Sequence, residues 1–146
     1  MRLKHACVDG GQYGVNVSPD EYQITGRRMI RTSDLAGRDL ASAGEGVFLG
    51  FTIPRTQILE KNDLLLSRAG TIGRSYLVPT DAAGMTFAGF LVRFRPASGF
   101  DARFLQYVIQ SKPVQEQISS QAVTSTIQNF NADRYANLAP LIHGPV

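Results

Sequence analysis

Two arginines flank a short glycine-containing segment in the middle of the chain. Arg68 and Arg74 stand six residues apart, with Gly70 and Gly73 between them. Apolar runs on both sides, bounded by glycines, indicate two buried strands. Glycine permits positive φ and lets the backbone approach a ligand closely, so we predict a strand, a tight basic loop and a return strand that together hold a phosphate or a base edge. The alternative is an ordinary hairpin whose arginines are solvated. The two runs are Leu64–Leu66 and Tyr76–Val78.

The length and composition of the chain predict one globular domain spanning residues 1–146. At 146 residues a folded chain buries roughly two-thirds of its extended surface, which is enough for a real core. Hydrophobic residues make up 43% and charged residues 18%, a balance typical of globular rather than disordered proteins.

The charge of the chain favours a nucleic-acid partner. The formal net charge is +3 and the pI is about 9.3, which permits a polyanionic partner without requiring one. Lysine is scarce and arginine dominates, with Arg27, Arg28 and Arg31 clustered within five residues. Because arginine binds phosphate and guanine through two parallel hydrogen bonds, this bias indicates nucleic-acid recognition.

The residues that enzymes need are not arranged for catalysis. The two histidines, His5 and His143, are near opposite ends and share no metal-type spacing with Cys7. Nucleophile-elbow, phosphate-loop and methyltransferase motifs are missing from the sequence. We therefore expect a binding module with no catalytic residue, metal or cofactor. A single cysteine and the lack of a long apolar run predict a cytoplasmic protein that does not enter a membrane.

The order of sequence patterns predicts an α+β fold. Short strand-like runs fill the first two-thirds, and residues 86–94 are the most strand-like of all. Helical periodicity begins after Asp101, a suitable N-cap, and continues in segments 113–121 and 133–138. We expect a twisted mixed or antiparallel sheet, or a partial barrel, with two or three helices in the C-terminal third. Five phenylalanines are assigned to the core: Phe87, Phe90, Phe94, Phe104 and Phe130.

Several short motifs follow one another along the chain. They are Tyr13-Gly14, Met29–Leu35 (MIRTSDL), Asn62–Gly73 (NDLLLSRAGTIG), Arg93–Pro96, Phe104-Leu105, Ser125–Asn131 (STIQNFN) and Leu138–Leu141. Taken in this order, they resemble a target-recognition domain from the DNA specificity subunit of type I restriction-modification enzymes. Asn62 stands where that family usually has glycine.

This resemblance implies a function and a set of partners. Such domains read one half of a split duplex-DNA site and act with a modification (methyltransferase) subunit and a restriction subunit. Family members usually carry two such domains joined by long helices, whereas this chain has one domain and no long helix. It is therefore expected to be a fragment or a half-subunit, and a half-subunit implies a homodimer.

The expected DNA-binding residues fall into three groups. Those of the glycine loop are assigned to phosphate or base-edge contact, or else to a hairpin that fixes the shape of the domain. Arg27 and Arg28 lie where the family pattern is lost, which suits variable base readout. The polar residues near the end contact phosphates or satisfy buried backbone. The full set is Arg27, Arg28, Arg68, Thr71, Arg74, Ser125, Thr126, Gln128 and Asn129.

Two other functions remain open at this point. One is a degenerate or regulatory module that binds modification or restriction subunits without binding DNA. The other is a single-strand or RNA binder.

Overall fold

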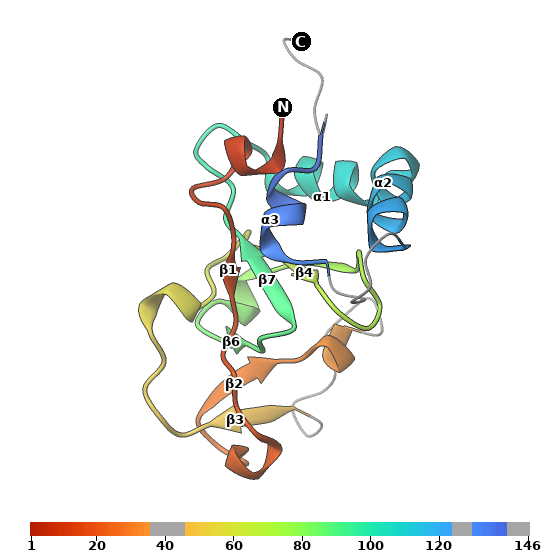
Figure 1. Cartoon of the computed structure of the whole chain (residues 1–146). Helices are drawn as coiled ribbons and strands as arrows, with labels where there is room; N and C mark the ends of the chain where they lie inside the picture. The colour runs from red at the N-terminus through yellow and green to blue at the C-terminus, as the bar shows by residue number, and fades with distance from the viewer. Residues whose placement is uncertain (36–45, 124–129, 140–146) are drawn as a thin grey trace.

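The computed structural model describes residues 1–35, 46–123 and 130–139, and it has the predicted α+β architecture. Two small sheets lie one beyond the other, and the helices gather at one end of the molecule (Figure 1). The N-terminus lies at the helical end. The described part of the chain therefore has three levels: helices, a larger sheet and a smaller sheet.

The larger sheet has four antiparallel strands in the order β1-β7-β4-β5. Leu65 of β4 lies opposite Arg93 of β7 and Tyr76 of β5, so β4 is a central strand. The β4–β5 pair is the hairpin that the two apolar runs predict. The strands are β1 (Gln12–Tyr13), β4 (Leu64–Ser67), β5 (Ser75–Leu77) and β7 (Leu91–Phe94).

The smaller sheet has three strands in the order β3-β2-β6, and it is mixed. β2 pairs antiparallel with β3 and parallel with β6. A parallel neighbour requires a long connection, and here the chain passes through β4 and β5 before it returns as β6. The strands are β2 (Arg27–Ile30), β3 (Val47–Leu49) and β6 (Thr86–Phe87).

Strand β4 separates two parts of the hydrophobic core. Leu64 and Leu66 pack with the helices, whereas Leu65 faces a second cluster that includes Ile30 and Phe87 of the smaller sheet. Side chains alternate between the faces of a strand, so a strand covered on both faces must be apolar at every position. The uninterrupted Leu64–Leu66 run is therefore what this location requires.

Three α-helices follow residue 101, as predicted. Asp101 caps α1 by accepting hydrogen bonds from the backbone N–H groups of Arg103 and Phe104. Asn131 caps α3 through the N–H of Arg134. The helices are α1 (Ala102–Gln110), α2 (Lys112–Val123) and α3 (Ala132–Ala136), and short 3-10 helices are η1 (Leu3–Ala6), η2 (Pro19–Glu21), η3 (Thr32–Leu35), η5 (Arg55–Gln57) and η6 (Thr80–Ala82).

The prediction of one strand over residues 86–94 is wrong. The run is divided into β6 and β7, which belong to different sheets, and Ala88–Phe90 forms the turn between them. The small residues Ala88 and Gly89 permit this turn, because the chain segment around Asn16 packs directly against Gly89.

Two of the five phenylalanines assigned to the core are exposed. Phe87, Phe94 and Phe130 are fully buried, but Phe90 is 65% exposed and Phe104 is 52% exposed. Phe90 lies in the turn rather than in a strand, and Phe104 lies on the solvent side of α1. Among the described residues, no helix is both long and apolar enough to cross a membrane.

Candidate nucleic-acid interface

The glycine loop between β4 and β5 is held in shape from inside the protein. Ser67 binds across the loop, since its hydroxyl donates to the Thr71 carbonyl and accepts from the Arg74 N–H at 3.1 Å. Gly70 and Gly73 both adopt positive φ, at +70° and +91°, as expected for the turn. The loop is thus an ordered hairpin end.

Tyr135 of α3 holds this loop through two hydrogen bonds of its hydroxyl group. Its hydroxyl donates to the Ser67 carbonyl at 2.5 Å and accepts from the Gly73 N–H at 3.0 Å. The tyrosine is fully buried, and this burial raises the pKa of its phenol above the usual range. Gln110 and Gln115 add donors to the Gly73 carbonyl at 3.1 and 3.3 Å. Sequence reasoning placed Tyr135 in a helix but gave no signal of this contact.

We expect Tyr135→Phe to destabilise the fold by about 2 kcal/mol. The ring still fits, but the buried Gly73 N–H loses its 3.0 Å acceptor and keeps only a 3.4 Å bond to the Ser67 carbonyl, which in turn loses its tyrosine donor. Urea unfolding measures the effect. Tyr107→Phe is the matched control, because Tyr107 is 75% exposed on α1 and its substitution should change stability by less than about 0.5 kcal/mol. Equal effects of the two substitutions would contradict the anchoring role.

Arg68 is engaged within the protein. Its guanidinium carbon lies 4.2 Å from the centre of the Tyr13 ring, and its Nη1 donates to the Gly89 carbonyl at 3.3 Å. Its backbone N–H donates to the Phe90 carbonyl at 3.0 Å. These contacts favour the structural alternative for Arg68, because they tie the loop to β1 and to the β6–β7 turn.

Thr71 and Arg74 are the loop residues with side chains available to a ligand. Thr71 is exposed, and Arg74 is half-buried with no ion pair among the described residues. In contrast, the guanidinium groups of Arg31 and Arg95 are paired with the buried carboxylates of Asp34 and Asp63. These ion pairs raise the pKa of both arginines further above their usual range.

Arg27 and Arg28 lie at the other end of the smaller sheet from the glycine loop. Arg27 donates to the Gly84 carbonyl, and Arg28 lies against Gly46. Both line a separate, open hollow with Phe48 and Asp81. The structure therefore does not bring these arginines together with Arg68. The remaining predicted site residues, Ser125, Thr126, Gln128 and Asn129, lie outside the described residues.

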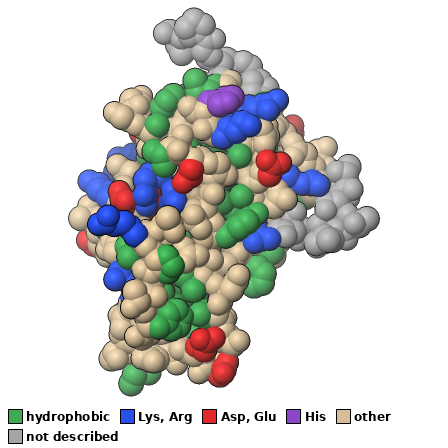
Figure 2. Space-filling view, turned by 60° about the vertical axis from the view of Figure 1, so that its left-hand side comes forward, with side chains coloured by type: hydrophobic (Ala, Val, Ile, Leu, Met, Phe, Trp, Pro, Cys, Tyr) green, Lys and Arg blue, Asp and Glu red, His purple; other side chains and the backbone are tan. Residues whose placement is uncertain are grey.

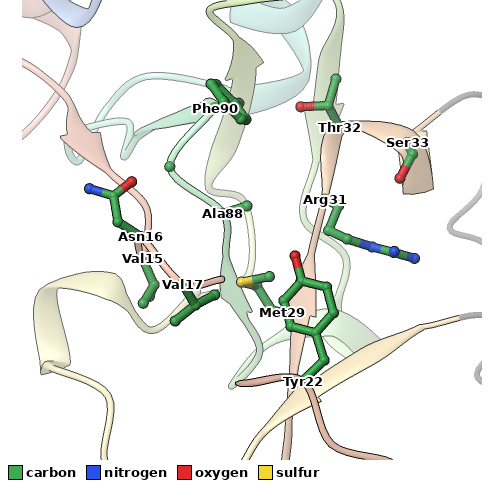
Figure 3. Close-up of a pocket in the computed structure, with 11 residues that line it drawn as sticks. Val15, Asn16, Val17, Tyr22, Met29, Arg31, Thr32, Ser33, Ala88 and Phe90 are labelled. Carbon is green, nitrogen blue, oxygen red and sulfur yellow. The ribbon is translucent and has the colours of Figure 1, made fainter. Parts of the chain in front are cut away.

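Two adjoining hollows lie beside the glycine loop, and we call them together the Phe90 groove. They share Thr32 and Phe90, and each has a volume of about 260 Å³. In Figure 3, Thr32 and Phe90 face each other at one end of the larger hollow, and Tyr22 and Met29 lie toward the other end. The lining residues are Val15, Asn16, Val17, Tyr22, Met29, Arg31, Thr32, Ser33, Ala88, Gly89 and Phe90, joined by Ala69 and Gly70 in the smaller hollow.

The Phe90 groove was not predicted from the sequence. Its walls come from the ends of β1 and β2, from the β6–β7 turn and from the glycine loop, which are distant in sequence. The sequence contains one signal of the turn that forms part of this groove, namely the small residues Ala88-Gly89 inside a strand-like run.

The face of the molecule drawn in Figure 2 carries charges of both signs. Figure 2 shows Lys and Arg side chains in several separate groups, interspersed with acidic side chains. No group of three or more His, Cys, Asp or Glu side chains within the described ranges could hold a metal ion. The arrangement thus offers dispersed cationic contacts and a partly apolar groove.

Two of the short motifs singled out in the sequence have structural roles in this fold. Asp34 accepts from the backbone N–H of Arg31 at 2.8 Å as well as from its side chain at 3.0 Å, so this pair stabilises the local turn. Asn62 adopts a φ of +72°, a conformation that glycine adopts freely and asparagine tolerates better than most residues. Asparagine is therefore a suitable residue for this turn.

Comparison with solved structures shows which known structures share this fold. Neither a protein-family model nor a curated protein matches the chain. The fold is similar to a chain from a study of the assembly and conformational transition of a type I restriction-modification system, with a TM-score of 0.68 and 14% identity over 94% of this chain and 32% of that one.

Two specificity subunits have the same fold over most of this chain. The HsdS subunit of Thermoanaerobacter tengcongensis gives a TM-score of 0.67 at 16% identity, over 97% of this chain and 33% of that one. The type I S subunit of M. genitalium gives 0.62 at 14% identity, over 94% and 32%. The chain spans about one third of the length of these structures. At the level of the fold, the resemblance inferred from the sequence is confirmed.

Proposed function

We propose that this chain is a non-catalytic DNA-recognition domain, occupying residues 1–146, that reads one half of a bipartite duplex site for a type I restriction-modification complex. The observation that carries the proposal is the match of nearly the whole chain to specificity subunits, at TM-scores of 0.62 and 0.67. The proposed partners are duplex DNA, a modification subunit and a restriction subunit in the cytoplasm. A homodimer is expected if the chain acts as a half-subunit.

The salt dependence of binding to duplex DNA tests this proposal, because the proposed contacts are made by arginines. Contacts between arginines and phosphates release counterions, so affinity for duplex DNA should fall steeply with salt, with a slope of about −0.9 per phosphate contacted. The first experiment measures affinity for a random duplex pool at two salt concentrations and sequences the bound fraction. A steep slope with an enriched short motif supports the proposal. A flat slope or no binding would overturn autonomous DNA recognition.

We expect Arg74→Gln to weaken binding to all sequences alike and to reduce the salt slope by about 0.9, as the loss of one phosphate contact requires. Among the described residues Arg74 forms no ion pair, whereas the guanidinium of the other loop arginine, Arg68, is engaged with the Tyr13 ring and the Gly89 carbonyl. The matched control is Arg103→Gln, which removes an exposed charge from α1 and should leave the slope unchanged. If both variants behave alike, Arg74 does not contact a phosphate.

One observation favours the second candidate, a module that binds partner subunits without DNA. α1 exposes two large aromatic side chains one turn apart, with Phe104 52% and Tyr107 75% exposed. Exposed aromatic residues of this kind are frequent at protein interfaces. Binding to a modification subunit together with no binding to the duplex pool would support this candidate.

A further inference from the structure

Asn16 places its side-chain amide on the surface beside the β6–β7 turn. The side chain is exposed, and it forms no hydrogen bond with the part of the chain that the structure describes. Its amide therefore keeps both a donor, Nδ2, and an acceptor, Oδ1, for a ligand. In Figure 3 the amide nitrogen of Asn16 points away from the larger hollow of the Phe90 groove.

The backbone that carries Asn16 is held by the β6–β7 turn. The Val15 N–H donates to the Phe87 carbonyl at 2.8 Å, and the Val15 carbonyl accepts from the Gly89 N–H at 3.0 Å. Val15 and Ala88 thus form a parallel bridge. Because two hydrogen bonds hold the preceding residue, Asn16 projects from a fixed part of the backbone. Groups that are in place before a ligand arrives lose less entropy when it binds.

Gly89 provides the space in which the Asn16 amide lies. A Cβ at Gly89 would lie 2.2 Å from Asn16 Oδ1 and 3.3 Å from its Cγ, whereas the Val15 carbonyl oxygen would be 3.6 Å away. Alanine at this position would therefore collide only with the end of a flexible side chain. Gly89 is not among the glycines with positive φ, so its backbone conformation does not require glycine either. Glycine is thus needed here to position an amide that makes no hydrogen bond within the described ranges, which indicates a role in binding.

A cation lies next to this amide. Arg68 Nη1 donates to the Gly89 carbonyl at 3.3 Å, so the guanidinium and the Asn16 amide meet at the same residue. A positive charge beside an exposed polar group attracts a polyanion. The surroundings of Asn16 are therefore suited to nucleic acid.

We propose that Asn16 reads an adenine in the major groove, where Nδ2 donates to N7 and Oδ1 accepts from the N6 amino group. Adenine presents this acceptor and this donor side by side, and asparagine and glutamine commonly bind the pair through two hydrogen bonds. Guanine has two acceptors at the same positions, so Oδ1 would face an acceptor. The inference rests on the proposed function and deepens it, because it names a base and the residue that reads it.

The test uses the whole chain and the duplexes enriched from the random pool. Each adenine of the enriched motif, on either strand, is replaced in turn by 7-deazaadenine, which has carbon in place of N7 and still pairs with thymine. At one position we expect the affinity to fall about fivefold, the contribution of one hydrogen bond.

Two substitutions assign this response to Asn16. Asn16→Ala should reduce the effect of 7-deazaadenine at that position to less than about twofold. Gly89→Ala should do the same, because its Cβ displaces the amide, and it should have no further effect in the Asn16→Ala background. Gly10→Ala is the matched control and should leave the response unchanged, since a Cβ there meets nothing within 4 Å.

Asn16→Asp gives a readout that a merely structural role would not change. The carboxylate has the shape of the amide but carries only acceptors, which suit the N4 amino group of cytosine rather than adenine. Selection repeated with this variant should therefore no longer give adenine at the responding position, and cytosine is the expected replacement. Continued selection of adenine there would overturn the assignment to Asn16.

The outcomes separate this inference from the function on which it rests. An enriched motif in which no adenine responds to 7-deazaadenine, or a response that Asn16→Ala leaves intact, overturns adenine readout while DNA recognition stands. Absence of any enriched motif overturns both.

Discussion

Replacing Gly14 with alanine should destabilise the protein by about 3 kcal/mol or more, because there is no space for the added atom. A Cβ at this position would lie 2.2 Å from the Ala88 carbonyl oxygen and 2.3 Å from that of Phe87. Both are backbone atoms, so no side-chain rotation relieves the overlap. The chain would have to move away from the β6–β7 turn, which would break the Val15 N–H bond to the Phe87 carbonyl.

Gly10→Ala provides the matched control for this prediction. A Cβ at Gly10 meets nothing within 4 Å, and the two glycines are close in sequence. Urea unfolding of the two variants should therefore differ by about 3 kcal/mol. Similar stabilities of the two variants would show that the segment around Gly14 can move away from the β6–β7 turn at little cost. Close packing would then not be the reason for glycine at this position.

The second large effect is expected for Asp63→Ala, at about 3 to 4 kcal/mol. The Asp63 carboxylate is fully buried, accepts from Arg95 Nε at 2.8 Å and Nη2 at 3.0 Å, and accepts from the Glu60 N–H at 2.7 Å. Removing one partner of a buried ion pair typically costs about 3–5 kcal/mol, since the other charge loses its counterion. Arg95 is partly exposed, which places the expected value at the lower end of that range.

Glu60→Ala tests whether burial, rather than the charge pair itself, determines the effect. The Glu60 carboxylate also pairs with Arg95, at 2.8 Å, but its side chain is 65% exposed. Exposed pairs contribute at most about 1 kcal/mol because water screens them. Chemical denaturation of both variants gives the comparison, and a larger loss from Glu60→Ala would contradict the argument.

The sequence predicted those parts of the fold that local patterns determine. The apolar runs around Arg68 and Arg74 gave the β4–β5 hairpin, and the change of period after Asp101 gave α1 with its N-cap. For each of these elements, the apolar periodicity and the residues that mark its ends, such as a glycine or an N-cap, lie within a few residues of one another. The α+β class follows from the same information.

The parts that sequence reasoning missed depend on contacts between distant segments. A β-prone run such as residues 86–94 contains no information on which sheet its two halves join. Phe90 has the composition of a core residue, and only the turn places it in solvent. The contact between the Arg68 guanidinium and the Tyr13 ring likewise joins segments that are distant in sequence, and no local pattern indicates it.

The parallel pairing of β2 with β6 has a consequence for the order in which the protein assembles. The β4–β5 hairpin joins segments that are neighbours in sequence. In contrast, Ile30 pairs with Phe87 and Gln12 pairs with Arg93, which are far along the chain. Pairings between distant residues form slowly, because loop closure precedes the contacts that stabilise them. The Phe90 groove is built from these late pairings, so a growing chain acquires this groove only after β7 has emerged from the ribosome. A nascent chain that stops earlier has the β4–β5 hairpin but not the groove.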